Sequence, residues 1–296
     1  VLLILNSLMM MSNVFLMMTR SLASASRIVE VLDEKIDITD EKSQDISVKN
    51  GDIEFDHVWF KYKNEAKEYV LSDVSFHIKP GQTVGIIGQT GSAKTTLVQL
   101  IPRLYDTNKG TVRIDGIDVK NYPVRHLRDA IAVVLQKNTL FSGSLISNLR
   151  WGNENAAKEE IDEACHIACV DEFLDRLPNG YESEMGQGGV NVSGGQKQRI
   201  CIARAILKKP KVLILDDSTS AVDTATEGRI REELAKKLPD MTKIVIAQRI
   251  SSVKHADQII ILDRGCVNAI GTHDELLKNN KIYQEIYESQ KEGADL

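Results

Sequence analysis

The sequence predicts an α/β fold whose central sheet is buried on both faces. Apolar, largely β-branched runs at 212–215, 244–246 and 259–262 alternate with helical patterns. A strand that is apolar along its whole length must be covered on both sides. In segment 84–96 a similar run ends at a glycine, crosses a loop of small residues and enters a helical pattern. This order of strand, tight loop and helix is typical of α/β proteins that bind phosphate groups.

The loop in that segment carries the residue types that hold phosphate. The pattern is Gly, four residues, Gly, Lys and Ser/Thr, and here it starts at Gly88 and has Ala93 in place of the second glycine. Backbone N–H groups and the helix N-terminus bind the anion, so the Ala93 methyl group restricts the backbone but removes no donor. We expect Lys94 to add positive charge and the Thr95 hydroxyl to be a Mg²⁺ ligand. The predicted nucleotide-binding residues of the loop are Gly88, Gln89, Thr90, Gly91, Ser92, Ala93, Lys94, Thr95 and Thr96.

Composition limits the function classes. A chain of 296 residues can form one large domain or two ordinary ones. With 37 basic and 42 acidic residues the net charge is −5, which does not favour a nucleic-acid partner. Four cysteines are too few for a disulfide scaffold, and Cys165 and Cys169, four apart in a helical pattern, lack matching metal ligands nearby. We interpret them as core thiols in a reducing compartment.

The first element is an apolar stretch over 1–18, interrupted only by a few Asn and Ser residues. It predicts the end of a truncated membrane span over 1–20, since a full span needs about 20 such residues. A signal peptide is the alternative, but no basic segment precedes the stretch, Arg20 interrupts it, and the chain has no initiator methionine. By the positive-inside rule for membrane proteins, Arg20 and Arg27 predict that the rest of the chain lies on the cytoplasmic side. Residues 21–50 are predicted to be a helical extension, over 19–32, and an acidic linker.

A compact domain is predicted over 51–290, with a tail at 291–296. Apolar runs at 53–60 and 70–78 predict strands of a small N-terminal antiparallel β-subdomain, before the Pro80-Gly81 turn and the strand of the phosphate loop. Further strands are expected at 111–114 and 131–135. From 144 to 205 the pattern is helical with one glycine-rich interruption at 186–195, which predicts an inserted helical subdomain over about 138–205.

Several later motifs, in order, resemble the ATP-binding cassette (ABC) proteins. Residues 191–199 (Asn-Val-Ser-Gly-Gly-Gln-Lys-Gln-Arg) resemble the family signature, 212–216 the Walker B strand, and 220–223 the D-loop. Gln136 is similar in position to the Q-loop glutamine, and Tyr62 to the aromatic residue that stacks on adenine. Three features resemble ABC exporters in particular: the segments 139–144 and 184–189 and the apolar helix that precedes the domain. The resemblance implies a P-loop NTPase (RecA-like) core of the ABC ATPase type.

The resemblance also implies how ATP and Mg²⁺ are held. Two such domains close head to tail on two ATP molecules, each between the phosphate loop of one domain and the signature of the other. The signature serine opens a helix, so its amides and hydroxyl can bind a γ-phosphate. The resemblance assigns ATP contacts to Tyr62, Gln136, Ser193, Gly194, Gly195, Gln196 and Asp223, and metal contacts to Thr95, Gln136 and Asp216. These residues also have plainer interpretations. They are a core tyrosine for Tyr62, a surface amide for Gln136, a flexible turn for Ser193-Gly194-Gly195, a helix cap for Asp223 and a strand-end carboxylate for Asp216.

Two positions depart from the family pattern at the expected catalytic site of Lys94, Asp217 and Gln248. The family usually has a glutamate at position 217 and a histidine at position 248. Shortening the carboxylate by one methylene moves it on the order of 1 Å, which can cost ~10²-fold in rate. Gln248 can hydrogen-bond a γ-phosphate but cannot become cationic. His255 lies in a different segment, so a surface or core role is favoured over its replacing the histidine.

The sequence therefore indicates the ATP-hydrolysing part of an ABC exporter with weak turnover at its own site. Its expected location is the plasma (inner) membrane. The expected partners are the transmembrane domains of both halves and a second half-transporter, non-identical and carrying the glutamate and histidine. Three alternatives remain: an active homodimer, a nucleotide-gated structural partner without meaningful turnover, and a soluble ABC protein of DNA repair or translation. The apolar stretch at 1–18 and the acidic balance argue against the third.

Overall fold

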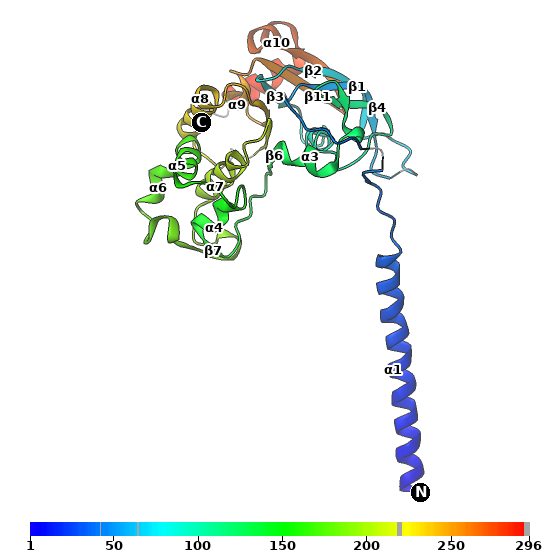
Figure 1. Ribbon diagram of the computed structural model, residues 1–296. Helices are drawn as coiled ribbons and strands as arrows, with labels where there is room; N and C mark the ends of the chain where they lie inside the picture. The colour runs from blue at the N-terminus through cyan, green and yellow to red at the C-terminus, as the bar shows by residue number, and fades with distance from the viewer. Residues whose placement is uncertain (42, 64, 218–220, 293–296) are drawn as a thin grey trace. The chain divides into compact units, whose positions relative to one another are not determined.

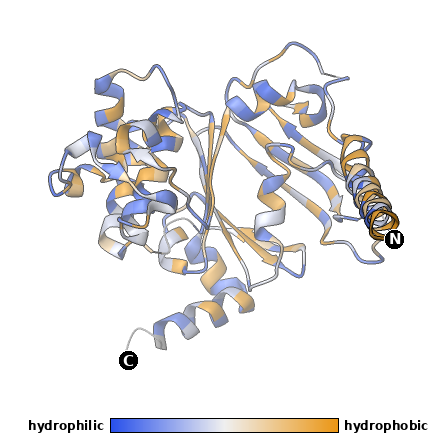
Figure 2. Cartoon of the chain, turned by 90° about the horizontal axis from the view of Figure 1, so that it is seen from below, coloured by the Kyte–Doolittle hydropathy of each residue, from blue (hydrophilic) through white to orange (hydrophobic). Residues whose placement is uncertain are grey.

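The computed structural model describes residues 1–41, 43–63, 65–217 and 221–292, and it divides into two units, 1–39 and 40–296. Helix α1 (Leu2–Leu32) forms the first unit and buries none of its side chains. It includes the segment 19–32, where a helix was expected. Among the described residues it is the one helix that is long and apolar enough to cross a membrane, with a mean hydropathy of 1.7. In Figure 2 its apolar residues are drawn in orange.

A six-stranded sheet forms the centre of the second unit, in the order β12-β11-β3-β10-β9-β6. All neighbouring pairs are parallel except β11 and β12. The strands are β3 (Thr83–Ile87), β6 (Ile131–Val134), β9 (Val212–Asp216), β10 (Thr242–Ile246), β11 (Gln258–Asp263) and β12 (Cys266–Gly271). Strand β9 is buried at every position, as its continuous apolar run predicts. Because parallel strands end at the same edge, the carboxyl ends of β3, β9 and β10 meet there.

An antiparallel sheet lies beside the central one, in the order β2-β1-β4-β5. Its strands are β1 (Ile53–Phe60), β2 (Leu71–Ile78), β4 (Lys109–Ile114) and β5 (Ile117–Asp118). Alternate residues of β1 and β2 are buried against the central sheet and helix α2 (Lys94–Gln99). Figure 1 shows this sheet on one side of the central strands and the helices α4 to α7 on the other. The predicted α/β fold with a P-loop core and an antiparallel β-subdomain is confirmed.

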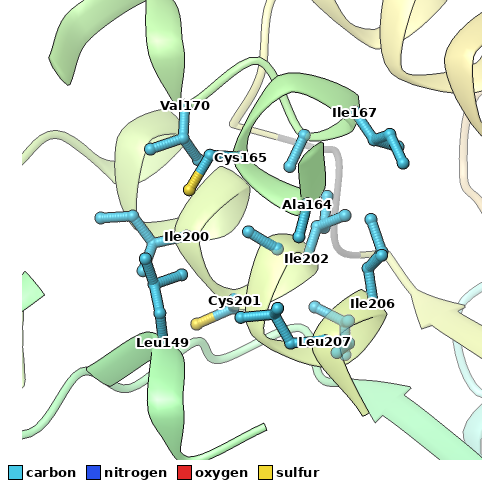
Figure 3. Close-up of a cluster of buried hydrophobic side chains, with 14 of the residues drawn as sticks. Leu149, Ala164, Cys165, Ile167, Val170, Ile200, Cys201, Ile202, Ile206 and Leu207 are labelled. Carbon is cyan, nitrogen blue, oxygen red and sulfur yellow. The ribbon is translucent and has the colours of Figure 1, made fainter. Parts of the chain in front are cut away.

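The inserted helical part packs in an apolar cluster (Figure 3) that it shares with β6, β9 and α8. It contains α4 (Leu145–Arg150), α5 (Lys158–Ile167), α6 (Asp171–Leu174) and α7 (Gly194–Leu207). The interruption of the helical pattern, predicted at 186–195, begins earlier in the structure. The chain leaves the helical pattern after α6 and passes through η2 (Gly180–Glu182), β8 (Glu184–Met185) and η3 (Gln187–Gly189). Strand β8 pairs with β7 (Gly143–Ser144), so the two exporter-like segments, 139–144 and 184–189, lie together.

The remaining elements are helical: η1 (Val119–Asn121), α3 (Val124–Asp129), α8 (Thr224–Lys237), α9 (Ile250–Val253), α10 (His273–Asn279) and α11 (Lys281–Glu292). Cys165, Cys169 and Cys201 are buried and unbridged, and burial raises the pKa of the Cys165 thiol to about 12. A thiol with so high a pKa is an apolar packing group. Cys266 is exposed.

The acidic stretch before the domain is bound to it along residues 40–50, where the sequence predicted a linker. The Asp115 carboxylate accepts hydrogen bonds from four successive backbone N–H groups, those of residues 49–52, at 2.6 to 3.0 Å. Val48 is buried, and the Gln44 N–H donates to Asn121 O at 2.8 Å. The compact unit accordingly starts at Asp40 rather than near Gly51.

Candidate functional site

The phosphate-type loop joins the end of β3 to the start of α2. A Cβ atom at Gly88 would come within 2.3 Å of Leu262 O and 2.6 Å of Ser92 Oγ, so only glycine fits. Gly91 has φ +85 and open space around it. Ala93 also has a left-handed backbone, with φ 72 and ψ 22. The loop therefore keeps the glycine-type conformation at position 93 although the residue is alanine.

Lys94 folds back over the loop. Its Nζ donates to Gly88 O at 2.7 Å and to Gln89 O at 2.9 Å. Burial lowers the pKa of Lys94, and the negative charges of Asp216 and Asp217 oppose that shift. The ammonium group is thus held at the mouth of the loop, where its hydrogen bonds to carbonyl oxygens can be exchanged for bonds to phosphate oxygens.

Thr95 and Asp216 bring two oxygen ligands together. Thr95 Oγ1 donates to Asp216 Oδ1 at 3.3 Å, although the residues are 121 positions apart. Asp216 is the last residue of β9 and only 5% exposed. Burial raises its pKa, while the hydrogen bond from Thr95 and the charge of Lys94 oppose the shift. A hydroxyl and a carboxylate so placed match the oxygen ligands that Mg²⁺ prefers.

Asp217 lies between two glutamine amides. Its Oδ2 accepts from Gln136 Nε2 at 3.0 Å and from Gln248 Nε2 at 2.8 Å. Its backbone has φ 48, and its N–H donates to Ile246 O at 2.9 Å. Burial raises the pKa of Asp217, while the Gln136 hydrogen bond and the Lys94 charge oppose the shift. Three residues singled out from separate parts of the sequence thus form one hydrogen-bonded group.

These residues line a single cavity of about 360 Å³. Its lining consists of Val70, residues 90–96, Gln136, Asp216, Asp217, Ile246 and Gln248. His255 is not part of this lining; it borders a different cavity with Arg231 and Asp257. Among the described residues, no group of three or more His, Cys, Asp or Glu side chains is arranged to hold a metal ion. A metal at this site would therefore depend on the Thr95 and Asp216 oxygens together with phosphate and water.

Tyr62 lies beside the phosphate loop with 51% of its surface exposed. Its hydroxyl is 2.9 Å from Thr96 Oγ1. Tyr105 packs edge-on against the Tyr62 ring with centroids 5.1 Å apart, and Phe60 does the same at 4.9 Å. Tyr105 was not predicted from the sequence, because an aromatic residue in a loop gives no signal until the fold places it beside Tyr62.

The signature residues lie outside this cavity, at the start of α7. Ser193 caps the helix: its Oγ accepts from the Gln196 N–H at 3.2 Å, and the Ser193 N–H donates to Gln196 Oε1 at 2.9 Å. Ser193 and Gly194 lie at the surface. A Cβ at Gly195 would come within 2.8 Å of Ala221 O, which ties the signature to the D-loop. The helix N-terminus therefore points a set of N–H groups outward.

Asp223 caps α8. Its Oδ1 accepts from the Thr226 N–H at 2.9 Å, and that bond lowers the pKa of the Asp223 carboxyl. The Ala221 N–H donates to Gln198 Oε1 at 3.1 Å. Ser220, the first residue of the D-loop motif, lies outside the described residues. Asp223 is thus a helix cap, as the plainer interpretation stated, and it borders the same surface as the signature.

Comparison with known proteins agrees with this geometry. The family model described as ABC transporter matches residues 71–220. The uncharacterised ABC transporter ATP-binding protein YfiB of Bacillus subtilis is 47% identical over 83% of this chain and 43% of its own length. The putative multidrug export ATP-binding/permease protein YgaD of Bacillus subtilis is 44% identical over 81% of this chain and 41% of its own length.

A solved structure is similar as well. A bacterial Atm1-family ABC exporter with ATP bound superposes with a TM-score of 0.87 at 33% identity, covering 92% of this chain and 48% of the exporter chain. The chain thus spans less than half the length of these relatives. The family model, the phosphate loop, the Asp216 strand end and the signature helix agree, and the chain belongs to the ABC transporter family.

Proposed function

We propose that this chain is the ATP-binding and ATP-hydrolysing part of an ABC exporter, with weak turnover at its own site. The observation that carries the proposal is the Asp217 carboxylate, held between the amides of Gln136 and Gln248 beside the phosphate loop. The names of the relatives, which include multidrug export proteins, support the exporter assignment.

The phosphate loop and its surroundings fit ATP. Gly88 packs against Leu262 O and Ser92 Oγ without room for a side chain, and this keeps the loop in a tight conformation whose backbone N–H groups can face an anion. Lys94 exchanges its bonds to carbonyl oxygens for bonds to the β- and γ-phosphates. Tyr62, half exposed and supported by two aromatic rings, offers a face on which adenine stacks.

The oxygens of Thr95 and Asp216 fit Mg²⁺, with Gln136 as a further ligand. When bound, the ion neutralises phosphate charge and orients the γ-phosphate. Asp216 has its pKa raised by burial in this structure, and a bound cation favours its ionised form. Holding the cation and keeping the carboxylate charged are therefore mutually reinforcing.

Hydrolysis at this site is slow because the Asp217 side chain is short and the Gln248 amide carries no charge. Asp217 accepts a proton from the attacking water from a position one methylene further back than a glutamate would. Gln248 donates its amide hydrogen to the γ-phosphate but adds no positive charge. Both residues can keep ATP in place while contributing little to its cleavage.

The signature helix supports a two-domain arrangement. Its N–H groups would contact the γ-phosphate held by the loop of a second ABC half, and the partner's signature would complete the site described here. A non-identical partner with glutamate and histidine at the matching positions would supply the fast site. An active homodimer is the second candidate, favoured by the intact phosphate loop and signature.

Helix α1 supports a membrane location. Its largely apolar surface, with a mean hydropathy of 1.7, is suited to lipid, so the proposed setting is the plasma (inner) membrane. By the positive-inside rule, Arg20 and Arg27 support a cytoplasmic position for the ATP-binding domain. The paired segments β7 and β8, together with Gln136, are the proposed contacts to the transmembrane domains of both halves.

The test uses the full-length protein purified with any ABC half that co-purifies from its host. Asp217→Glu combined with Gln248→His is expected to raise ATP turnover at this site by about 10²-fold. Asp263→Glu, at the end of strand β11 and outside the cavity lining, is the matched control and leaves turnover unchanged. Fast turnover by the unaltered chain alone, with no gain from the double variant, would contradict the slow-site assignment and favour the homodimer.

A further inference from the structure

The C-terminal helix α11 reaches the loop that carries Gln248. Gln290, in the last turns of α11, makes two hydrogen bonds to that loop. Its Oε1 accepts from the Ile250 N–H at 2.8 Å, and its Nε2 donates to Gln248 O at 2.7 Å. One side-chain amide thus bonds to peptide groups on both sides of Arg249, much as a neighbouring strand would.

These two bonds fix the backbone from which the Gln248 side chain extends. The Gln248 amide in turn donates to Asp217 Oδ2 at 2.8 Å. The connection runs from the C-terminal helix through the backbone of residues 248–250 to the carboxylate of the site. Gln290 itself lies outside the lining of the cavity.

Helix α11 is a firm support for this contact. Tyr283 is fully buried, and its hydroxyl is 2.8 Å from His273 Nδ1. Ile282, Ile286 and Tyr287 pack on the same apolar cluster as Ile250 and Val253 of helix α9. The helix that carries Gln290 and the helix that begins at Ile250 therefore share one core and keep a fixed spacing.

We propose that Gln290 is a positioning residue for position 248: it holds the loop so that the Gln248 amide points toward the γ-phosphate of bound ATP. The inference rests on the proposed function, which assigns the γ-phosphate contact to Gln248. It adds the C-terminal helix as the element that controls this contact. Loss of the two Gln290 bonds lets the loop move away while the phosphate loop, which also holds the β-phosphate that ADP shares with ATP, is unaffected.

The test measures how well the full-length protein distinguishes ATP from ADP, with Mg²⁺ present. Gln290→Ala is expected to lower the ratio of the ADP Kd to the ATP Kd about tenfold, as for loss of one hydrogen bond to a charged group, with ADP affinity unchanged. Gln290→Glu keeps the acceptor for the Ile250 N–H but places a second acceptor against Gln248 O, so it lowers the ratio as well. It serves as the second variant if Gln290→Ala folds poorly.

Gln284→Ala is the matched control. Gln284 lies on the same helix, and its amide donates to Leu277 O and Lys278 O of α10, not to the loop. It is expected to leave the nucleotide ratio unchanged. Equal ratios for Gln290→Ala and Gln284→Ala would overturn the inference.

A double-variant cycle separates positioning from general destabilisation. In the Gln248→Ala background, adding Gln290→Ala is expected to cause no further fall in the ratio, because Gln290 acts through position 248. An additive fall would overturn the inference. If Gln248→Ala alone leaves the ratio unchanged, the γ-phosphate role of Gln248 is wrong and the inference fails with it. In that case hydrogen exchange at the Ile250 N–H tells which step is wrong. Faster exchange in Gln290→Ala, with unchanged exchange in Gln284→Ala, would show that Gln290 does hold the loop and that the γ-phosphate role of Gln248 is the wrong step.

Discussion

Burial of Asp216 makes the stability of the domain depend on pH. The pKa of this carboxyl is raised by burial, against the opposing hydrogen bond from Thr95 and charge of Lys94. The folded chain thus binds this proton more tightly than the unfolded chain. The unfolding free energy therefore falls as pH rises from the ordinary aspartate pKa to the raised one, and Asp216 changes it no further above that window. At neutral pH the ionised carboxylate costs stability that Thr95 and Lys94 offset in part.

Asp216→Asn is accordingly expected to stabilise the nucleotide-free domain at pH 7. Thr95 and Lys94 offset much of the cost of the buried charge, so we expect a gain on the order of 1 kcal/mol, or about 2–4 °C in Tm. The gain should shrink as pH falls through the raised pKa, because the carboxyl of the unaltered protein then becomes neutral. Thermal melts of both proteins across the acid range test this. Asp45→Asn, at a side chain 97% exposed, is the control, and a gain independent of pH would rule out charge burial as the cause.

Ala93 is a second residue whose energetics the backbone determines. Its φ of 72 lies in the left-handed region, which costs an alanine roughly 1–2 kcal/mol. Glycine relieves this strain but adds about 0.4–1 kcal/mol of unfolded-state entropy. Ala93→Gly should therefore raise Tm by roughly 1–4 °C. Ala130→Gly, at a helix end with φ −82, gains no relief and should lower Tm; a fall in both variants would contradict the strain argument.

At the scale of elements, strands with apolar residues on at least one face were predictable, and strands without a buried face or with only two residues were not. Strand β9 is buried at all five positions, so its apolar run alone predicts the strand. Strand β12 alternates between exposed and half-buried residues, and its backbone pairs with β11 alone in the sheet, so no apolar run marks it. The β7–β8 pair is two residues long on each side, which is too short for any periodicity to register.

The residues of the candidate site also divide into those that the sequence predicts and those that it does not. Lys94, Thr95 and Asp216 follow from local patterns, because a loop between strand and helix and a carboxylate at a strand end can be read within one segment. Gln290 and Tyr105 could not be found so, since their roles depend on packing between distant segments. The binding of residues 49–52 to Asp115 is another such case, because 63 to 66 positions separate the partners.

Asp115 joins the entering chain to the β4–β5 turn, and its loss is expected to weaken that junction. Asp115→Ala leaves four N–H groups without their acceptor, two of them part-buried. We expect a loss of about 2 kcal/mol, or roughly 4–8 °C in Tm. Asp118→Ala, which removes a single bond to the Lys120 N–H at 2.9 Å, is the control and should cost clearly less. Similar Tm losses for the two variants would show that the four bonds do not act together.

At the scale of the whole molecule, the same junction determines where an independently folding domain begins. A chain of residues 40–296 lacks the apolar helix α1, none of whose side chains is buried, and should be soluble and fold without it. A chain of residues 51–296 also lacks the buried Val48 and two of the four donors to Asp115.

These losses predict that the 51–296 chain is less stable than the 40–296 chain by about 3 kcal/mol, or roughly 6–12 °C in Tm. A chain of residues 45–296 keeps Val48 and the Asp115 bonds but loses the bond from the Val124 N–H to Asp40 and that of Gln44 to Asn121. It should therefore melt between the other two. Thermal melts of the three chains in one buffer measure this order. Equal Tm values for 40–296 and 51–296 would mean that residues 40–50 rest on the domain without stabilising it, and the domain would then begin near Gly51, as the sequence alone predicted.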